Sequence, residues 1–237
     1  MSETPQFALP LLAAAQAQKH VTVNEALLRL DALAAMRFVA IDLSVPPTGA
    51  GEGDAYIVAQ GATGDWSGND GAIAVWANGG WLFVQPKIGW RGSDAATGRA
   101  VLFDGVDWLL DGAIASPGGA ATLQRVLEID HTLGAGATAS VAGAIPSATQ
   151  VLGITARVTT AISGTATAWS LGVAGSADRY GSGLGIGLNS YAAGLSGSPV
   201  SYYADTDLLL TAEGGTFAGG AIRLAVHLLA IRPPRAV

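Results

Sequence analysis

Four tyrosines and one asparagine are the side chains in this sequence best suited to bind a ligand. They are Tyr180, Asn189, Tyr191, Tyr202 and Tyr203, and glycine, alanine and serine surround them, as in loops. A tyrosine presents an apolar ring and a hydroxyl group, which together suit the ring face and the polar edge of a sugar. The alternative is that these tyrosines pack against loops or a neighbouring subunit. On the first interpretation they form a candidate glycan-binding surface.

A second group of polar side chains precedes the first expected helix. It comprises Gln16, Gln18, Lys19, His20, Asn24 and Glu25. Thr22 and Glu25 have the spacing of a capping box, in which each side chain satisfies a backbone N–H of the helix start. Apolar residues at helical spacing follow and predict a short amphipathic helix over residues 23–36. The group is either an assembly surface or a local hydrogen-bonded knot, and we take its residues as candidates for attachment and assembly.

Patterns typical of catalysis or of a bound cofactor are missing from the sequence. There are no cysteines, and His20, His131 and His227 do not have metal-ligand spacing. Residues 181–187 are rich in glycine but lack the Lys-Ser/Thr ending and the helix of a phosphate-binding loop. We therefore predict no enzyme, no catalytic residues, no metal and no cofactor.

Two weaker possibilities concern acidic residues. Residues 65–71 are rich in side-chain oxygen and could hold calcium, although turn chemistry explains the same residues. A glycosidase needs two carboxylates about 5 to 9.5 Å apart. Its candidates here are Glu128, Asp130, Asp205, Asp207 and Glu213, but no spacing selects a pair.

Composition narrows the classes of partner. The net charge is −6, and the 12 lysines and arginines are scattered rather than gathered in a basic stripe, which argues against nucleic-acid binding. No apolar run is long enough to span a bilayer, and the N-terminus does not have the pattern of a secretory signal. The high apolar fraction of 50% favours an oligomer that buries further surface.

The expected elements fall into two modules. Residues 1–115 carry the helix and five of the six tryptophans, and Asn-Gly and Asp-Gly predict β-hairpins over 73–84 and 100–110. This predicts a small Trp-rich antiparallel β module. Residues 116–237 contain short alternating segments separated by glycine and serine, which predict a β-sandwich or jelly-roll-like domain. The expected strands are 123–131, 151–160, 169–173, 183–188, 207–211 and 221–231.

The segment A-Q-A-Q-K-H-V-T-V-N-E-A-L at residues 15–27, with G-D-A-Y-I-V-A at 53–59, resembles an uncharacterised domain of unknown function. Such domains occur in proteins of alphaproteobacterial phages, prophages and gene transfer agents, and the resemblance covers about residues 8–110. It implies a virion component, a tail fibre or head spike. An N-terminal module would then attach to the particle and a distal module would meet the host.

These observations predict a particle-borne adhesion protein. We expect a homotrimer that contacts other virion proteins, binds host cell-surface polysaccharide and inserts into no membrane. We also expect it in a virion or gene-transfer-agent particle assembled in the bacterial cytoplasm. Two alternatives remain open: a capsule-degrading glycosidase or lyase carried on the particle, and a structural adaptor that binds no glycan.

Overall fold

The computed structural model describes residues 3–13 and 19–236, with backbone alone for residues 19 and 20. The chain divides into an N-terminal unit, Met1–Ala121 with Pro234–Val237, and a C-terminal unit, Thr122–Pro233. Both units consist mainly of β-strands, which confirms the predicted class. Within the described ranges, none of the helices has the length and apolar character of a membrane-spanning segment.

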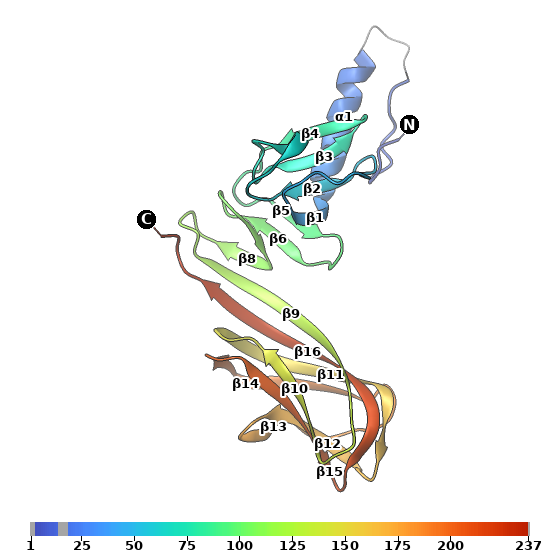
Figure 1. Ribbon diagram of the computed structural model, residues 1–237, viewed down its shortest axis with the longest axis vertical. Helices are drawn as coiled ribbons and strands as arrows, with labels where there is room; N and C mark the ends of the chain where they lie inside the picture. The colour runs from blue at the N-terminus through green and yellow to red at the C-terminus, as the bar shows by residue number, and fades with distance from the viewer. Residues whose placement is uncertain (1–2, 14–18, 237) are drawn as a thin grey trace. The chain divides into compact units, whose positions relative to one another are not determined.

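The N-terminal unit combines the helix α1 (Lys19–Ala35) with a seven-stranded sheet in the order β4-β3-β2-β1-β5-β6-β7 (Figure 1). The strands are β1 (Arg37–Leu43), β2 (Ala55–Val58), β3 (Ile73–Ala77), β4 (Gly80–Val84), β5 (Arg91–Asp94), β6 (Ala100–Phe103) and β7 (Trp108–Leu110). The short 3-10 helix η1 (Gly64–Trp66) and strand β8 (Gly112–Ala115) also belong to this unit.

Strand β1 departs from the antiparallel arrangement that we expected. It runs parallel to β2, with Phe38 opposite Ala55, and parallel to β5, with Arg37 opposite Ser93. The sheet is therefore mixed, and the prediction of a purely antiparallel module is wrong. The Asn-Gly and Asp-Gly signals report only on strands that are joined by a tight turn. Parallel neighbours need longer connections, and the connections leave no comparable sequence signal.

The two expected hairpins correspond to β3-β4 and β6-β7. At the first turn Asn78 and Gly79 have φ angles of 52° and 76°, the left-handed conformation that a two-residue turn needs. Trp76 lies opposite Trp81, with ring centroids 5.0 Å apart. Trp108 contacts the fully buried Phe38 edge-on at 5.4 Å. These aromatic residues thus help to build the folded unit.

The two faces of the sheet bury separate apolar clusters. Ala32 of α1 packs on one face with Phe38 and other sheet residues. On the opposite face Trp66 of η1 is fully buried against Tyr56, with ring centroids 5.7 Å apart. Because both faces are covered, α1 and the η1 segment are integral parts of this unit.

The helix α1 begins at Lys19, earlier than the expected residue 23. Thr22 therefore lies inside the helix. The predicted capping box is wrong, because a capping residue must directly precede the first turn of the helix. Glu25 pairs instead with Arg29 one turn later, at 2.7 Å. At the other end Met36 has a φ of 38°, a left-handed conformation that ends the helix.

Asp31 fastens the segment before the helix to α1. Its carboxylate accepts hydrogen bonds from the Thr4 hydroxyl at 2.6 Å, from the Phe7 N–H at 2.8 Å and from the Gln6 N–H at 2.9 Å. Asp31 is only 1% exposed, so these donors replace the water that its charge would otherwise bind. This buried contact fixes the N-terminal segment on the helix.

A second buried carboxylate, Asp104, holds the C-terminal segment within the same unit. Arg235 forms an ion pair with Asp104, whose side chain has no exposed surface. The backbone N–H groups of Val106 and Asp107 also donate to Asp104, at 3.0 and 2.8 Å. The Arg235 N–H donates to the Gly118 carbonyl at 2.9 Å. The end of the chain is thereby tied to the loop after β6 and to the loop after β8.

Acid is expected to weaken the N-terminal unit through Asp104. Burial opposes ionisation, but the N–H groups of Asp107 and Val106 and the Arg235 charge together lower the pKa of Asp104. The folded pKa then lies below the unfolded value of about 3.9. The stabilisation is therefore complete above about pH 4 and is lost as the pH falls through the folded pKa. Urea unfolding monitored by tryptophan fluorescence between pH 7 and pH 3 measures this slope. Asp104→Asn should flatten the slope, and an unchanged slope in that variant would contradict the assignment.

The C-terminal unit is an antiparallel two-sheet structure. Its strands are β9 (Ala121–Thr132), β10 (Thr138–Ile145), β11 (Thr149–Gly164), β12 (Ala168–Val173), β13 (Ser176–Leu184), β14 (Tyr191–Tyr202), β15 (Thr206–Glu213) and β16 (Phe217–Arg232). One sheet has the order β10-β15-β12-β13, and the other contributes β14-β11-β16-β9 (Figure 1). Leu171 and Leu210 of the first sheet share one core with Ile154 and Leu224 of the second, and all four are fully buried.

Two details of these strands differ from the expected alternation. In β11 the register shifts between Val151 and Gly153 against both neighbouring strands, so Val151 is buried whereas Leu152 is only partly buried. Such a bulge places an extra residue in the strand and moves a side chain off the expected face. The strand expected over 183–188 is wrong beyond Leu184, where β13 ends and a turn joins Gly187 to Ser190.

Candidate functional site

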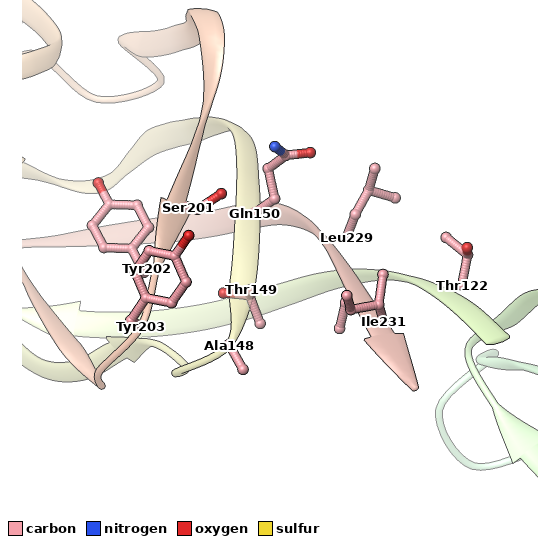
Figure 2. A pocket seen from close by; sticks show the side chains of 10 residues that line it. Thr122, Ala148, Thr149, Gln150, Ser201, Tyr202, Tyr203, Leu229 and Ile231 are labelled. Carbon is pink, nitrogen blue, oxygen red and sulfur yellow. The ribbon is translucent and has the colours of Figure 1, made fainter. Parts of the chain in front are cut away.

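A groove at one end of the C-terminal unit gathers tyrosine, hydroxyl, amide and apolar side chains (Figure 2). It forms where β14 and β16 end and where β9 and β11 begin, and its volume is about 490 Å³. Its lining residues are Thr122, Ala148, Thr149, Gln150, Ser201, Tyr202, Tyr203, Leu229, Ala230 and Ile231. We call this set the tyrosine groove.

Strand register brings these distant segments together. Thr149 of β11 lies opposite Tyr202 of β14 on one side and opposite Ala230 of β16 on the other. Gln150 lies between Ser201 and Leu229 in the same way. Because side chains alternate along a strand, these are two adjacent rows that point to opposite faces at the end of the sheet. The groove therefore depends on the pairing of β14, β11 and β16.

Three polar side chains in the groove are available to a ligand. Gln150, Ser201 and Tyr203 make no side-chain hydrogen bond to residues 3–13 or 19–236, and Tyr203 is 90% exposed. Thr149 differs, because its hydroxyl donates to the Pro146 carbonyl at 2.7 Å. In Figure 2 the rings of Tyr202 and Tyr203 lie at one end of the groove, away from Thr122. An aromatic end with free polar groups beside it is the arrangement that binds a sugar ring.

Of the five predicted glycan-binding residues, only Tyr202 and Tyr203 line the groove. Tyr180 lies on β13 and is 2% exposed within the core, so the expectation of a loop tyrosine is wrong. Its hydroxyl is 2.7 Å from that of Tyr202. Tyr180 is thus a buried hydrogen-bond partner of Tyr202 and presents no ring face to a ligand. Strands β13 and β14 are rich in glycine, serine and alanine, a composition that is also typical of loops.

Asn189 and Tyr191 lie at the opposite end of β14 from the groove. Tyr202 and Tyr191 pair with Thr149 and Arg157 of β11, eight positions apart, and at about 3.3 Å per residue they are roughly 26 Å apart. Asn189 is an exposed turn residue with a φ of 67°. Tyr191 is 71% exposed, and the Arg157 guanidinium lies 5.7 Å from its ring centre. These two residues therefore do not share a site with Tyr202 and Tyr203.

Sequence reasoning missed most of the groove. Gln150 and Ser201 lie outside every expected strand, and Leu229 and Ile231 lie in the strand expected over 221–231, which carried no binding prediction. The one available signal was the step from Tyr202-Tyr203 into Ala204-Asp205, which marks a turn beside two aromatic rings. Nothing in the local sequence shows that β11 begins and β16 ends beside that turn.

The candidate attachment residues lie in different environments. Gln16 and Gln18 lie outside the described residues. Lys19 and His20 are the first two residues of α1, and only their backbone is described. Asn24 accepts a hydrogen bond from the Leu12 N–H at 2.8 Å and donates to the Leu12 carbonyl at 3.0 Å. Glu25 is exposed and paired with Arg29. Asn24 therefore has an internal role, holding the segment before the helix.

Replacing Asn24 with alanine is expected to loosen that segment. Losing a reciprocal pair of hydrogen bonds should cost about 1 kcal/mol, as is usual for partly solvated bonds. The measurement is the rate of proteolysis within residues 3–13. Glu25→Ala is the matched control on the same helix, because it removes only an exposed ion pair. Equal proteolysis rates in the two variants would contradict the role of Asn24.

The acidic residues considered for metal or acid–base chemistry have structural partners. Among residues 3–13 and 19–236, no group of three or more potential ligands is placed to hold a metal ion. Asp70 of the possible calcium loop accepts the N–H groups of Gly61 and Ala62. Asp207 accepts the Gly143 N–H, and Asp205 accepts the Ser147 N–H.

The remaining three carboxylate candidates are also engaged, and Glu128 lies 3.5 Å from the Arg223 guanidinium. Hydrogen bonding from Arg223 lowers the pKa of Asp130 and outweighs its slight desolvation. Both oxygens of Glu213 accept the Gly183 N–H. Each carboxylate thus stabilises a loop or a strand pair.

Residues 23–109 match the family described as Protein of unknown function (DUF2793). This segment is a DUF2793 domain. It lies within the N-terminal unit, covers less than half of the chain and falls inside the resemblance expected over residues 8–110. The family is uncharacterised, so the match assigns neither an activity nor a location.

Comparisons with known proteins beyond this domain are sparse. No curated protein matches the chain. A chain of the cyanophage Pam1 capsid asymmetric unit is similar at 23% identity, over 47% of this chain and 84% of that chain. The TM-score is 0.33, too low to indicate a shared fold.

Proposed function

We propose that this protein is a structural component of a phage-like particle, a tail fibre or head spike, that binds host cell-surface polysaccharide. The feature that supports a particle role is the resemblance of residues 8–110, which include the DUF2793 match at 23–109, to domains of phage and gene-transfer-agent proteins. In this proposal the DUF2793 domain attaches to other virion proteins. The C-terminal unit is a jelly roll that carries the glycan site.

The tyrosine groove is the observation that carries the binding function. It combines the exposed ring of Tyr203 with the free polar groups of Gln150 and Ser201 on one rigid sheet. Sugars offer a ring face for stacking and hydroxyls for hydrogen bonds, and a groove of about 490 Å³ is large enough for a short oligosaccharide segment. The ten lining residues of the groove, all within the described ranges, include no carboxylate and no histidine. Binding without cleavage is therefore the role that the groove supports best.

A homotrimer completes the proposal. Large apolar side chains of the C-terminal unit outside the groove are exposed, among them Leu195 at 83%, Leu188 at 61% and Val126 at 59%. An assembly that covers such side chains lowers the free energy of the exposed surface. Sedimentation equilibrium of the full chain should give three times the chain mass, and a monomer at micromolar concentration would refute the trimer.

The adhesion function is tested with the full-length protein on a glycan array and on alphaproteobacterial cells. Binding that polysaccharide extracted from the same cells competes away is the expected result. The absence of binding to every glycan and every cell would overturn the proposal and leave the structural adaptor. Release of reducing ends from the bound polysaccharide would instead favour the glycosidase or lyase. Immunogold electron microscopy of purified particles tests the virion location, and particles without label would refute it.

A further inference from the structure

We propose that the tyrosine groove selects an uncharged saccharide that carries an apolar substituent, namely the methyl group of a 6-deoxyhexose. This inference rests on the proposed function and specifies the substrate class of that site. Three features of the groove support it: the charge of the lining, its apolar side and the hydrogen-bond direction at Tyr202.

The lining has no charged side chain. All ten residues are apolar, hydroxyl-bearing or amide-bearing. A sugar carboxylate placed there would lose water without gaining a cation, and such desolvation is costly. Asp205 lies two residues beyond Tyr203, and its carboxylate is bound to the Ser147 N–H at 2.7 Å beside Ala148. Its negative charge, added to the net charge of −6, disfavours an acidic sugar further.

Arg232 follows Ile231 directly but does not supply the missing cation. It is not among the residues that line the groove, and it already has an interaction partner. The groove therefore has no cationic group for a uronic acid, a sulfate or a phosphate. An uncharged saccharide satisfies the groove without an unpaired charge.

The groove is apolar on the side away from the tyrosines. Leu229 and Ile231 of β16 line it there, and Ile231 is 82% exposed (Figure 2). The polar edge of a fully hydroxylated hexose would lose hydrogen bonds to water against these side chains. A methyl group in place of the hydroxymethyl group removes a hydroxyl that would be buried there without a hydrogen-bond partner. The apolar side therefore favours a deoxy sugar.

The hydrogen bond between Tyr180 and Tyr202 determines whether the Tyr202 hydroxyl can donate a hydrogen bond to a ligand. Burial raises the pKa of Tyr180, so its hydroxyl remains protonated. The hydroxyl of Tyr202, 2.7 Å away, is the one hydrogen-bond partner of Tyr180 among the described residues. A buried hydroxyl that donates nothing is unfavourable, so Tyr180 donates and Tyr202 accepts. The hydroxyl proton of Tyr202 is then free to donate to a ring or ester oxygen of the ligand.

The experiment compares three sugars that differ only at carbon 6. Multivalent displays of 6-deoxygalactose, galactose and galacturonic acid, and the corresponding glucose series, are titrated with the full-length protein at low and high salt. We expect the deoxy sugar of at least one series to bind more tightly than its hydroxymethyl form, by at least about fivefold, because the hydroxymethyl form buries a hydroxyl without a partner. The uronic acid should show no binding. Because no ion pair is involved, raising the salt concentration should change binding less than twofold.

The possible outcomes separate the inference from the function. Loss of deoxy-sugar binding in Tyr203→Ala, with retention in Tyr191→Ala, supports the groove as the site. Equal or tighter binding of the uronic acid, or strong salt dependence, would overturn the inference and leave glycan binding intact. If no display binds, the inference is also overturned, and the array and cell assays decide separately on the proposed function.

Discussion

Replacing Tyr203 with alanine is expected to weaken polysaccharide binding at least about tenfold, while the protein remains folded. The side chain is 90% exposed, so its removal takes little from the core. An aromatic ring that stacks on a ligand commonly contributes 1.4 kcal/mol or more, which corresponds to about tenfold in affinity. Binding of purified polysaccharide to the immobilised full-length protein measures the change, and the urea unfolding midpoint checks the fold.

Tyr191→Ala is the matched control for that variant. Tyr191 is 71% exposed on the same strand, but it lies at the opposite end of β14. It should bind polysaccharide as the unaltered protein does. If Tyr191→Ala lost binding and Tyr203→Ala kept it, the site would lie beside Arg157 and Asn189 instead of in the tyrosine groove.

Replacing Asp31 with alanine is expected to destabilise the N-terminal unit by about 3 kcal/mol. Three donors now bind its carboxylate, and Thr4 and Asp31 are 3% and 1% exposed. Without the acceptor, buried donors lose their partner, and hydrogen bonds to a charged group are among the stronger ones. Urea unfolding followed by tryptophan fluorescence is selective here, because Trp169 is the one tryptophan outside this unit.

Asp31→Asn separates hydrogen bonding from side-chain removal. The Thr4 hydroxyl and the Phe7 N–H share Oδ1, which an asparagine oxygen can replace, whereas the Gln6 N–H uses Oδ2. We therefore expect a loss of about half that of Asp31→Ala, in line with keeping part of the bonds. Proteolysis within residues 3–13 should increase in the same order. A stability change below about 0.5 kcal/mol for Asp31→Ala would show that the segment is not held by this residue.

Local signals predicted the elements that depend on neighbouring residues. Asn78-Gly79 placed the turn of the β3-β4 hairpin, since few other residues adopt two left-handed conformations in succession. The alternation of Ile222, Leu224, Val226 and Leu228 predicted a buried strand face, and each of the four is fully buried. In both cases the information lies within a few positions of the chain.

The same reasoning failed where a strand has little side-chain bulk. Strand β14 reads Y-A-A-G-L-S-G-S-P-V-S-Y, with few of the branched and aromatic residues typical of strands. Its position as the edge strand beside β11 comes from pairing with residues 34 to 53 positions earlier in the sequence, Arg157 with Tyr191 and Thr149 with Tyr202. Such strands are ordered by backbone hydrogen bonds to a neighbour, and no short window of sequence reports on that neighbour.

The amino-acid sequence alone determined the β class, the DUF2793-like opening and the presence of tyrosines with ligand-binding chemistry. Only the tertiary structure decided which tyrosines form a site. It buried Tyr180, separated Tyr191 from Tyr203 along one strand, and added Gln150 and Leu229 from two other strands. The physical reason is that a groove at the end of a sheet is defined by strand register, and register is set by pairing between segments far apart in the chain.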